Sequence, residues 1–217
     1  MFNTDGISAF IFDMDGVLLD TESLCKKCWR LAAEEWKLKD VDEVYYQCVG
    51  QATQDTLFTL QNFFEKQNKN FNAREWYDCA RNFFRKTEES EGIELMPGAK
   101  NCLERLKTKG FVLALASSTR RQTVERQLSR SGLIDYFKTL TCGDSVEHSK
   151  PDPEIYLKAC ASVGIKPKNC VAVEDSPNGV LSAYNAGLKV VLVPDQIKPD
   201  ERIKSLCAKI LNSLEEI

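Results

Sequence analysis

Residues 8–16 read SAFIFDMDG, a short apolar segment that ends in two aspartates and a glycine. The apolar run is continuous rather than alternating, which is typical of a strand covered on both faces of a parallel sheet. The same form recurs in FVLALAS at 111–117, KTLTCG at 138–143, CVAVED at 170–175 and KVVLVP at 189–194. We therefore predict a mainly parallel sheet built from these segments.

Helical segments separate the predicted strands. One lies between Pro97 and Gly110, and others cover residues 119–131, 151–164, 177–187 and 200–214. Segment 151–164 carries prolines and acidic residues in its first turn and a glycine at its end, which is a strong start and stop signal. Alternation of strand and helix predicts an α/β fold, a three-layer Rossmann-like core.

Residues 20–91 interrupt this alternation. Apolar residues recur there at helical spacing, and no convincing strand is present. We predict an inserted all-helical cap domain at 20–91, with a core domain formed by 1–19 and 92–217.

The composition narrows the possible partners and location. The 217 residues carry a formal net charge of −3, which argues against a nucleic-acid surface. No apolar run approaches the length of a membrane span. The nine cysteines are an odd number scattered along a chain without an export signal, which favours free thiols in a reducing cytoplasm. A monomer is the simplest expectation.

Asp13 and Asp15 follow the first predicted strand, and period-two geometry places their carboxylates on the same side. Ligands bind at the carboxyl edge of open α/β sheets. Gly16 lets the backbone turn sharply beside a ligand. Taken alone, the segment fits an ordinary turn at a strand end equally well.

Three further features stand at other predicted strand ends. Ser117 and Ser118 could bind a phosphate oxygen, although either Ser118 or the next residue could merely cap a helix. Lys150 could neutralise a phosphate, and the pair Glu174 and Asp175 offers oxygen ligands suited to Mg²⁺. Each feature has an ordinary structural explanation, but their combination at strand ends favours phosphoryl chemistry.

Four segments then resemble the motifs of the haloacid dehalogenase superfamily, in its β-phosphoglucomutase-like and phosphoglycolate-phosphatase-like branch with a helical cap. They are FDMDGVLLDTE at 12–22, ALASS at 114–118, SKPDPEIY at 149–156 and VEDSPNGVLSAYNAG at 173–187. The match spans nearly the whole chain.

The resemblance implies a role for each matched residue. Asp13 would be the nucleophile, and Asp15 the general acid and base, with its main-chain carbonyl on the metal. Ser117 and Lys150 would hold the transferring phosphate. Asp13, Asp15 and Asp175, with Glu174 bound directly or through water, would form the Mg²⁺ site.

The cap bears on the choice between phosphatase and mutase. In β-phosphoglucomutases a cap loop carries an arginine for the distal phosphate, and Thr53 stands at the matching position here. This departure favours hydrolysis, although Arg81 or Arg85 could compensate. The polar, uncharged loop with Gly50 and Gln51 suits the hydroxyl groups of a small sugar or polyol phosphate.

We therefore predict substrate contacts from Gly50, Gln51, Thr53 and Ser118. The expected activity is that of a Mg²⁺-dependent phosphatase acting on a small phosphorylated metabolite through an aspartyl-phosphate. The alternatives are a phosphosugar mutase and a non-catalytic module that binds phosphate or metal.

Overall fold

The computed structural model describes residues 4–51 and 53–217. Backbone contacts divide the chain into two compact units. The core unit runs to Asp20 and resumes at Glu94, and the helical unit spans Thr21–Ile93. Among the described residues, no helix combines the length and apolarity needed to cross a bilayer.

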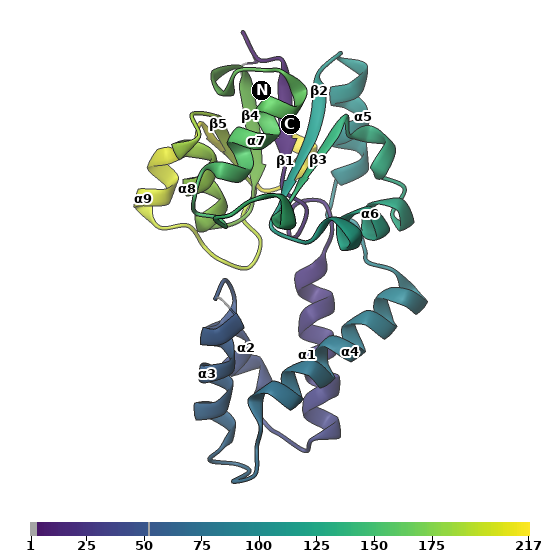
Figure 1. Ribbon diagram of the computed structural model, residues 1–217, viewed down its shortest axis with the longest axis vertical. Coiled ribbons are helices and arrows are strands. Elements are labelled where there is room, and N and C mark those ends of the chain that lie inside the picture. Colours follow the sequence, from purple (N-terminus) through teal and green to yellow (C-terminus); the bar gives the residue numbers. More distant parts are fainter. Residues whose placement is uncertain (1–3, 52) are drawn as a thin grey trace. The chain divides into compact units, whose positions relative to one another are not determined.

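The core unit is built on a six-stranded sheet in the order β3-β2-β1-β4-β5-β6, and all its strand pairs are parallel (Figure 1). The strands are β1 (Ala9–Phe12), β2 (Val112–Ser117), β3 (Thr139–Cys142), β4 (Cys170–Glu174), β5 (Lys189–Leu192) and β6 (Lys209–Ile210). All four residues of β1 are fully buried between β2 and β4. The predicted α/β fold with a mainly parallel sheet is confirmed.

Helices cover both faces of this sheet. They are α5 (Ala99–Thr108), α6 (Arg121–Arg130), α7 (Glu154–Val163), α8 (Pro177–Asn185) and α9 (Glu201–Leu206). Ala9 and Ile11 of β1 share one hydrophobic core with α7 and α8. Because side chains alternate along a strand, Phe10 points to the other face, where its ring meets Phe111 edge to face at 5.1 Å.

The prediction of one helix over residues 200–214 is wrong. The helix α9 ends at Leu206, and Cys207 has an extended backbone. The N–H of Ala208 then donates to Val190 O and that of Leu211 to Leu192 O, at 2.8 and 2.9 Å. The open edge of β5 thus offers hydrogen-bond partners that a continued helix would leave unpaired, and residues 209–210 form β6.

The helical unit contains α1 (Thr21–Glu35), α2 (Val41–Cys48), α3 (Thr53–Phe64) and α4 (Ala73–Glu91). Its core contains Trp29 and Trp76, whose rings meet edge to face at 5.1 Å. Asn72 caps α4 by accepting hydrogen bonds from the N–H groups of Arg74 and Glu75. The unit therefore has an apolar core of its own.

Two segments of the core unit, on either side of the inserted helical unit, pair with each other through their backbones. Leu19 and Leu95 form an antiparallel bridge. The N–H of Asp20 donates to Glu94 O at 2.9 Å, and that of Met96 donates to Leu18 O at 3.0 Å. The chain therefore leaves and re-enters the core unit at one paired point.

Candidate active site

Three neighbouring strands place polar residues at one edge of the sheet. Asp13 directly follows β1, and its N–H still bonds to Val173 O of β4 at 3.0 Å. Ser117 is the last residue of β2 and Glu174 the last of β4. Since the strands are parallel, their carboxyl ends meet at the same edge, where α/β proteins bind ligands.

Lys150 links these strand ends. Its Nζ donates to Asp13 Oδ1 at 2.6 Å, to Glu174 Oε1 at 2.7 Å and to Ala116 O at 3.1 Å. Only 8% of the lysine side chain is exposed, and the Glu174 side chain is fully buried. Asp13, Lys150 and Glu174, predicted as parts of one site, therefore lie in direct contact.

The site holds more acidic than basic side chains. Burial raises the pKa of Asp13 to about 7, and the Glu174 and Asp15 carboxylates add to the rise while Lys150 opposes it. Burial also raises the pKa of Asp175, with Glu174 and Asp13 as further causes. Burial by itself lowers the pKa of Lys150, but Asp13 and Glu174 outweigh that effect and raise it. The lysine therefore stays charged.

Asp13, Glu174 and Asp175 offer a set of oxygen ligands. One ligand atom from each of them lies within 4.8 Å of the others. Buried carboxylates in excess over a single lysine favour a further cation, and such oxygens suit Mg²⁺. The arrangement fits the predicted ion.

Glu174 has a different environment from the other two carboxylates. Its Oε1 accepts from Lys150 and from the hydroxyl of Tyr156, the latter at 2.6 Å. Its Oε2 accepts from the N–H of Asp175 at 3.3 Å and from Ser176 Oγ at 3.4 Å. Both oxygens of Glu174 therefore have donors within the protein, and Oε1 holds Lys150.

Gly16 allows the loop after β1 to approach Asp175. Its φ of 74° lies in the left-handed region that favours glycine. A Cβ at this position would lie 2.6 Å from Asp175 Oδ2 and 3.4 Å from Asp195 Oδ2. The predicted sharp turn is therefore also a close approach to two carboxylates.

Asp15 makes a contact that the sequence did not indicate. Its Oδ2 accepts a hydrogen bond from Thr119 Oγ1 at 2.9 Å. Thr119 follows the two serines in the loop after β2, and its N–H donates to Ser117 Oγ at 3.1 Å. Ser117 is buried and Ser118 is exposed. The position of Thr119 just beyond a strand end was the only available signal.

Tyr156 and Asp195 are further residues that sequence reasoning missed. Burial, with the Glu174 carboxylate as the next cause, raises the pKa of the Tyr156 hydroxyl well above its ordinary value. Asp195 follows β5, and its buried Oδ2 has no hydrogen-bond partner among the described residues. Burial raises its pKa as well. Tyr156 extends the hydrogen-bond network through Glu174, and Asp195 lies close to Gly16.

The predicted cap residues lie in the helical unit. Gly50 has a φ of 78°, and Gln51 Oε1 accepts from Thr59 Oγ1 at 3.2 Å. Thr53 is exposed at the start of α3. Their neighbour Ala52 lies outside the described residues. The substrate-binding role of this loop stays a prediction.

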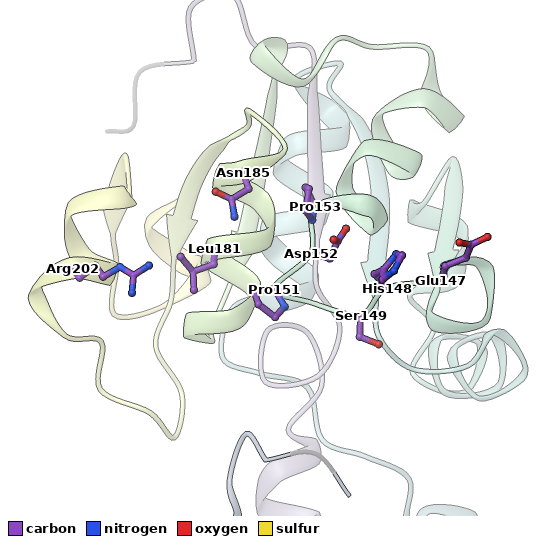
Figure 2. A pocket seen from close by; sticks show the side chains of 9 residues that line it. All are labelled: Glu147, His148, Ser149, Pro151, Asp152, Pro153, Leu181, Asn185 and Arg202. Atoms are coloured by element: carbon purple, nitrogen blue, oxygen red, sulfur yellow. The ribbon is translucent and has the colours of Figure 1, made fainter. Parts of the chain in front are cut away.

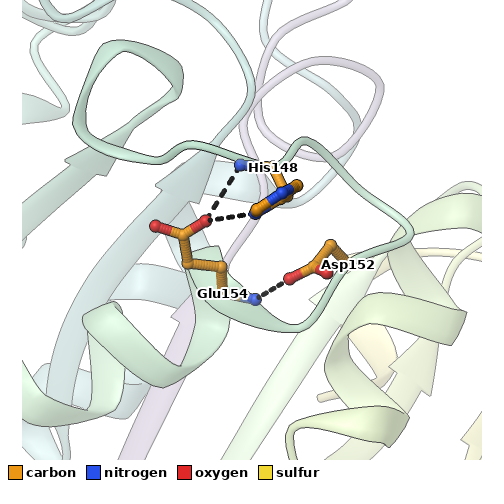
Figure 3. Close-up of side chains that lie close together, drawn as sticks. All are labelled: His148, Asp152 and Glu154. Atoms are coloured by element: carbon orange, nitrogen blue, oxygen red, sulfur yellow. Dashed lines mark hydrogen bonds and ion pairs between the residues drawn. The ribbon is translucent and has the colours of Figure 1, made fainter.

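A second group of ligand-type side chains consists of His148, Asp152 and Glu154 (Figure 3). Glu154 accepts from the N–H of His148 at 2.9 Å and pairs with Lys158 Nζ at 2.6 Å. Asp152 Oδ1 accepts from the N–H of Glu154 at 2.9 Å. These carboxylates therefore stabilise the loop before α7.

A surface pocket of about 730 Å³ lies beside this loop (Figure 2). The loop lines it with His148 and Pro151, α8 with Leu181, and α9 with Arg202. Neither Asp13 nor the other carboxylates around Lys150 line it. The pocket is thus separate from the cluster at the strand ends.

Comparisons with known proteins agree with this geometry. The family model described as "Haloacid dehalogenase-like hydrolase" matches residues 10–193. The "Phosphorylated carbohydrates phosphatase" of Thermotoga maritima is 35% identical over 84% of this chain and 83% of its own length. The "Probable pseudouridine-5'-phosphatase" of Drosophila melanogaster is 33% identical over 95% of this chain and 89% of its own length.

A solved structure shows the same fold. A "putative beta-phosphoglucomutase" from Thermotoga maritima superposes with a TM-score of 0.82 at 30% identity, over 97% of this chain and 96% of that chain. The chain belongs to the haloacid dehalogenase-like hydrolases. The predicted class, a phosphoric monoester hydrolase of this family, is confirmed by relatives that are phosphatases by name.

Proposed function

We propose that the chain is a Mg²⁺-dependent phosphatase that hydrolyses a small sugar or polyol phosphate through an aspartyl-phosphate formed on Asp13. The observation that carries the proposal is the 2.6 Å contact between Lys150 and the buried Asp13, with Asp175 beside it. The name of the Thermotoga maritima phosphatase supports a phosphorylated carbohydrate as substrate. A cytoplasmic location and a monomeric state stay predictions.

Asp13, Asp175 and the main-chain carbonyl of Asp15 would hold the Mg²⁺. When bound, the ion would neutralise negative charge on the phosphoryl oxygens. Lys150 supplies a positive charge from the protein itself and forms an ion pair with Glu174. Glu174 would therefore contribute through Lys150 or through water.

The first half of the reaction uses Asp13 and Asp15. A carboxylate oxygen of Asp13 bonds to phosphorus as the phosphorus–oxygen bond of the ester breaks. Asp15 gives its proton to the departing alkoxide oxygen. Thr119 orients Asp15 for this transfer, and Lys150 and the hydroxyl of Ser117 would hold the phosphoryl oxygens.

The second half returns the enzyme to its starting state. Asp15, now ionised, accepts a proton from water. The water oxygen bonds to phosphorus as the bond to Asp13 breaks, and inorganic phosphate is released. One difficult displacement is thereby divided into two easier ones.

Asp13→Asn tests this proposal, because the amide keeps the shape of the side chain but is a poor nucleophile. We expect phosphate release from p-nitrophenyl phosphate and a panel of sugar phosphates to fall about 1,000-fold or more. The exposed Asp135→Asn serves as the matched control. Acid quenching of the wild type during turnover should leave a phosphoryl group on the peptide containing Asp13. Full activity of Asp13→Asn would refute the proposal.

A phosphosugar mutase is the second candidate, and the likeness to the structure described as a β-phosphoglucomutase favours it. β-Glucose 1-phosphate with a trace of the bisphosphate separates the two. A phosphatase releases inorganic phosphate, and a mutase forms glucose 6-phosphate. A module without catalytic activity would release no phosphate from any substrate of the panel.

A further inference from the structure

Glu174 connects Lys150 to a second buried side chain, that of Tyr156. Glu174 Oε1 lies at the meeting point of two donors, the ammonium of Lys150 at 2.7 Å and the hydroxyl of Tyr156 at 2.6 Å. Both side chains come from one segment, since Tyr156 lies in the first turn of α7 and Lys150 lies just before that helix. The same segment therefore supplies both donors to Glu174 Oε1, the ammonium of Lys150 and the hydroxyl of Tyr156.

Tyr156 contacts the lysine in another way as well. Its side chain is fully buried, and Lys150 Nζ lies 5.2 Å from the centroid of its ring. A cation over the face of an aromatic ring is attracted by the electrons of that face. The ring and the Glu174 carboxylate thus both attract the ammonium, and Ala116 O accepts a hydrogen bond from it as well.

The hydroxyl also restricts Glu174. Without it, Oε1 would accept from Lys150 alone among the described residues, and a buried oxygen with fewer donors is less well fixed. With one donor fewer at Oε1, the distance and angle between this oxygen and the Lys150 ammonium would be less closely fixed. The 2.6 Å bond from Tyr156 supplies this second donor at Oε1.

We propose that Tyr156 is a positioning residue for phosphoryl transfer: its hydroxyl fixes Glu174 Oε1 and its ring backs Lys150, so that the ammonium stays on Asp13. The inference rests on the proposed function, because the lysine must meet the phosphoryl group beside that aspartate. It adds to the reaction a residue that does not touch the reacting atoms.

Tyr156→Phe removes the hydroxyl and keeps the ring. We expect kcat to fall about tenfold, as for loss of a hydrogen bond to a charged group, with KM changed less than twofold. The matched control is Tyr184→Phe on α8, whose side chain is half exposed. We expect the control to keep the kcat of the wild type.

A double-mutant cycle separates positioning from general loosening of the fold. If Tyr156 acts through Glu174, the substitution Tyr156→Phe lowers kcat little further in a Glu174→Gln background. Equal effects of Tyr156→Phe in both backgrounds would overturn the proposal. So would an unchanged kcat of the single variant.

Nuclear magnetic resonance tests the same contact without turnover. In the wild type we expect a slowly exchanging hydroxyl proton of Tyr156 and a protected ammonium signal of Lys150, assigned by its loss in Lys150→Arg. Tyr156→Phe should speed exchange of the ammonium protons several-fold. A hydroxyl proton in rapid exchange in the wild type would refute the proposal, even if the variant did not fold.

These results distinguish the two levels of inference. Full phosphatase activity of Asp13→Asn refutes the proposed function. An inactive Asp13→Asn together with a fully active Tyr156→Phe refutes the positioning role alone.

Discussion

Thr119 Oγ1 donates a hydrogen bond to Asp15 Oδ2 over 2.9 Å. The residue proposed as acid and base is thus held by the loop after β2, whereas the aspartate itself belongs to the loop after β1. Two strand ends therefore determine the direction of one carboxylate. An acid that must give and then take a proton needs such a fixed orientation.

Thr119→Ala removes this support. We expect kcat to fall about tenfold with little change in KM, because a hydrogen bond to a charged group typically contributes about 1.5 kcal/mol or more. Thr119→Ser keeps the hydroxyl and should retain most of the activity. Steady-state kinetics with a sugar phosphate measure both variants. Equal losses in the alanine and serine variants would contradict the orienting role of the hydroxyl.

Asp175→Asn should weaken Mg²⁺ binding. An ion that binds only the folded protein at about 100 times its Kd adds about 2.7 kcal/mol, which is roughly 5 °C or more in Tm. We expect this rise for the wild type and its loss in the variant, measured by thermal unfolding and by calorimetric titration. The control is Asp152→Asn in the second carboxylate group, which should keep the rise. The opposite pattern would place the ion at the His148 group.

Gly179→Ala should destabilise the core unit. Gly179 lies in the first turn of α8, and a Cβ there would overlap the carboxylate of Glu174. Overpacking of this kind costs about 1–3 kcal/mol. Urea unfolding measures the loss, and the exposed neighbour Asn178→Ala is the control. An unchanged free energy of unfolding would show that Glu174 has room to move.

Glu154 makes the stability depend on pH. The Lys158 ammonium, followed by the N–H groups of His148 and Glu147, lowers the pKa of Glu154 to about 2. Since the folded pKa lies below the unfolded value of about 4.3, the carboxylate stabilises the fold above that value. This stabilisation is lost as the pH falls toward 2.

Glu154→Gln tests the sign of this effect. The wild type should exceed the variant in free energy of unfolding at pH 7, and the difference should shrink steadily below about pH 4.3. Urea unfolding at a series of pH values measures it. A difference that stays constant from pH 7 to pH 3 would contradict the assignment of these contacts to the ionised form.

The apolar segments predicted the buried strands well. Phe10 and Ile11, for example, lie in a strand covered on both faces, and only such a strand is continuously apolar. The segment after Leu206 could not be predicted in this way. Lys209 and Ile210 are exposed, and their strand exists because the edge of β5 offers hydrogen-bond partners. Periodicity in one segment carries no information about a partner strand.

The residues of the candidate site likewise fall into those that the sequence predicts and those that it does not. Asp13 and Glu174 could be predicted because each stands at a strand end, and Lys150 because it carries a positive charge in the segment between β3 and α7. Tyr156 and Thr119 could not, because one looks like an ordinary core aromatic and the other like a helix cap. Their hydrogen bonds to Glu174 and Asp15 join residues that are 18 and 104 positions apart in the sequence.

The pairing of Asp20 with Glu94 has a consequence for how this architecture can vary. Every strand of the sheet lies outside Thr21–Ile93, and the backbone is already sealed where that segment begins and ends. We therefore expect that a different group of helices, or a short turn, could replace residues 21–93 without moving the carboxyl ends of the strands. The strand ends that carry Asp13 and Glu174 and the inserted segment thus belong to separate compact units of the backbone.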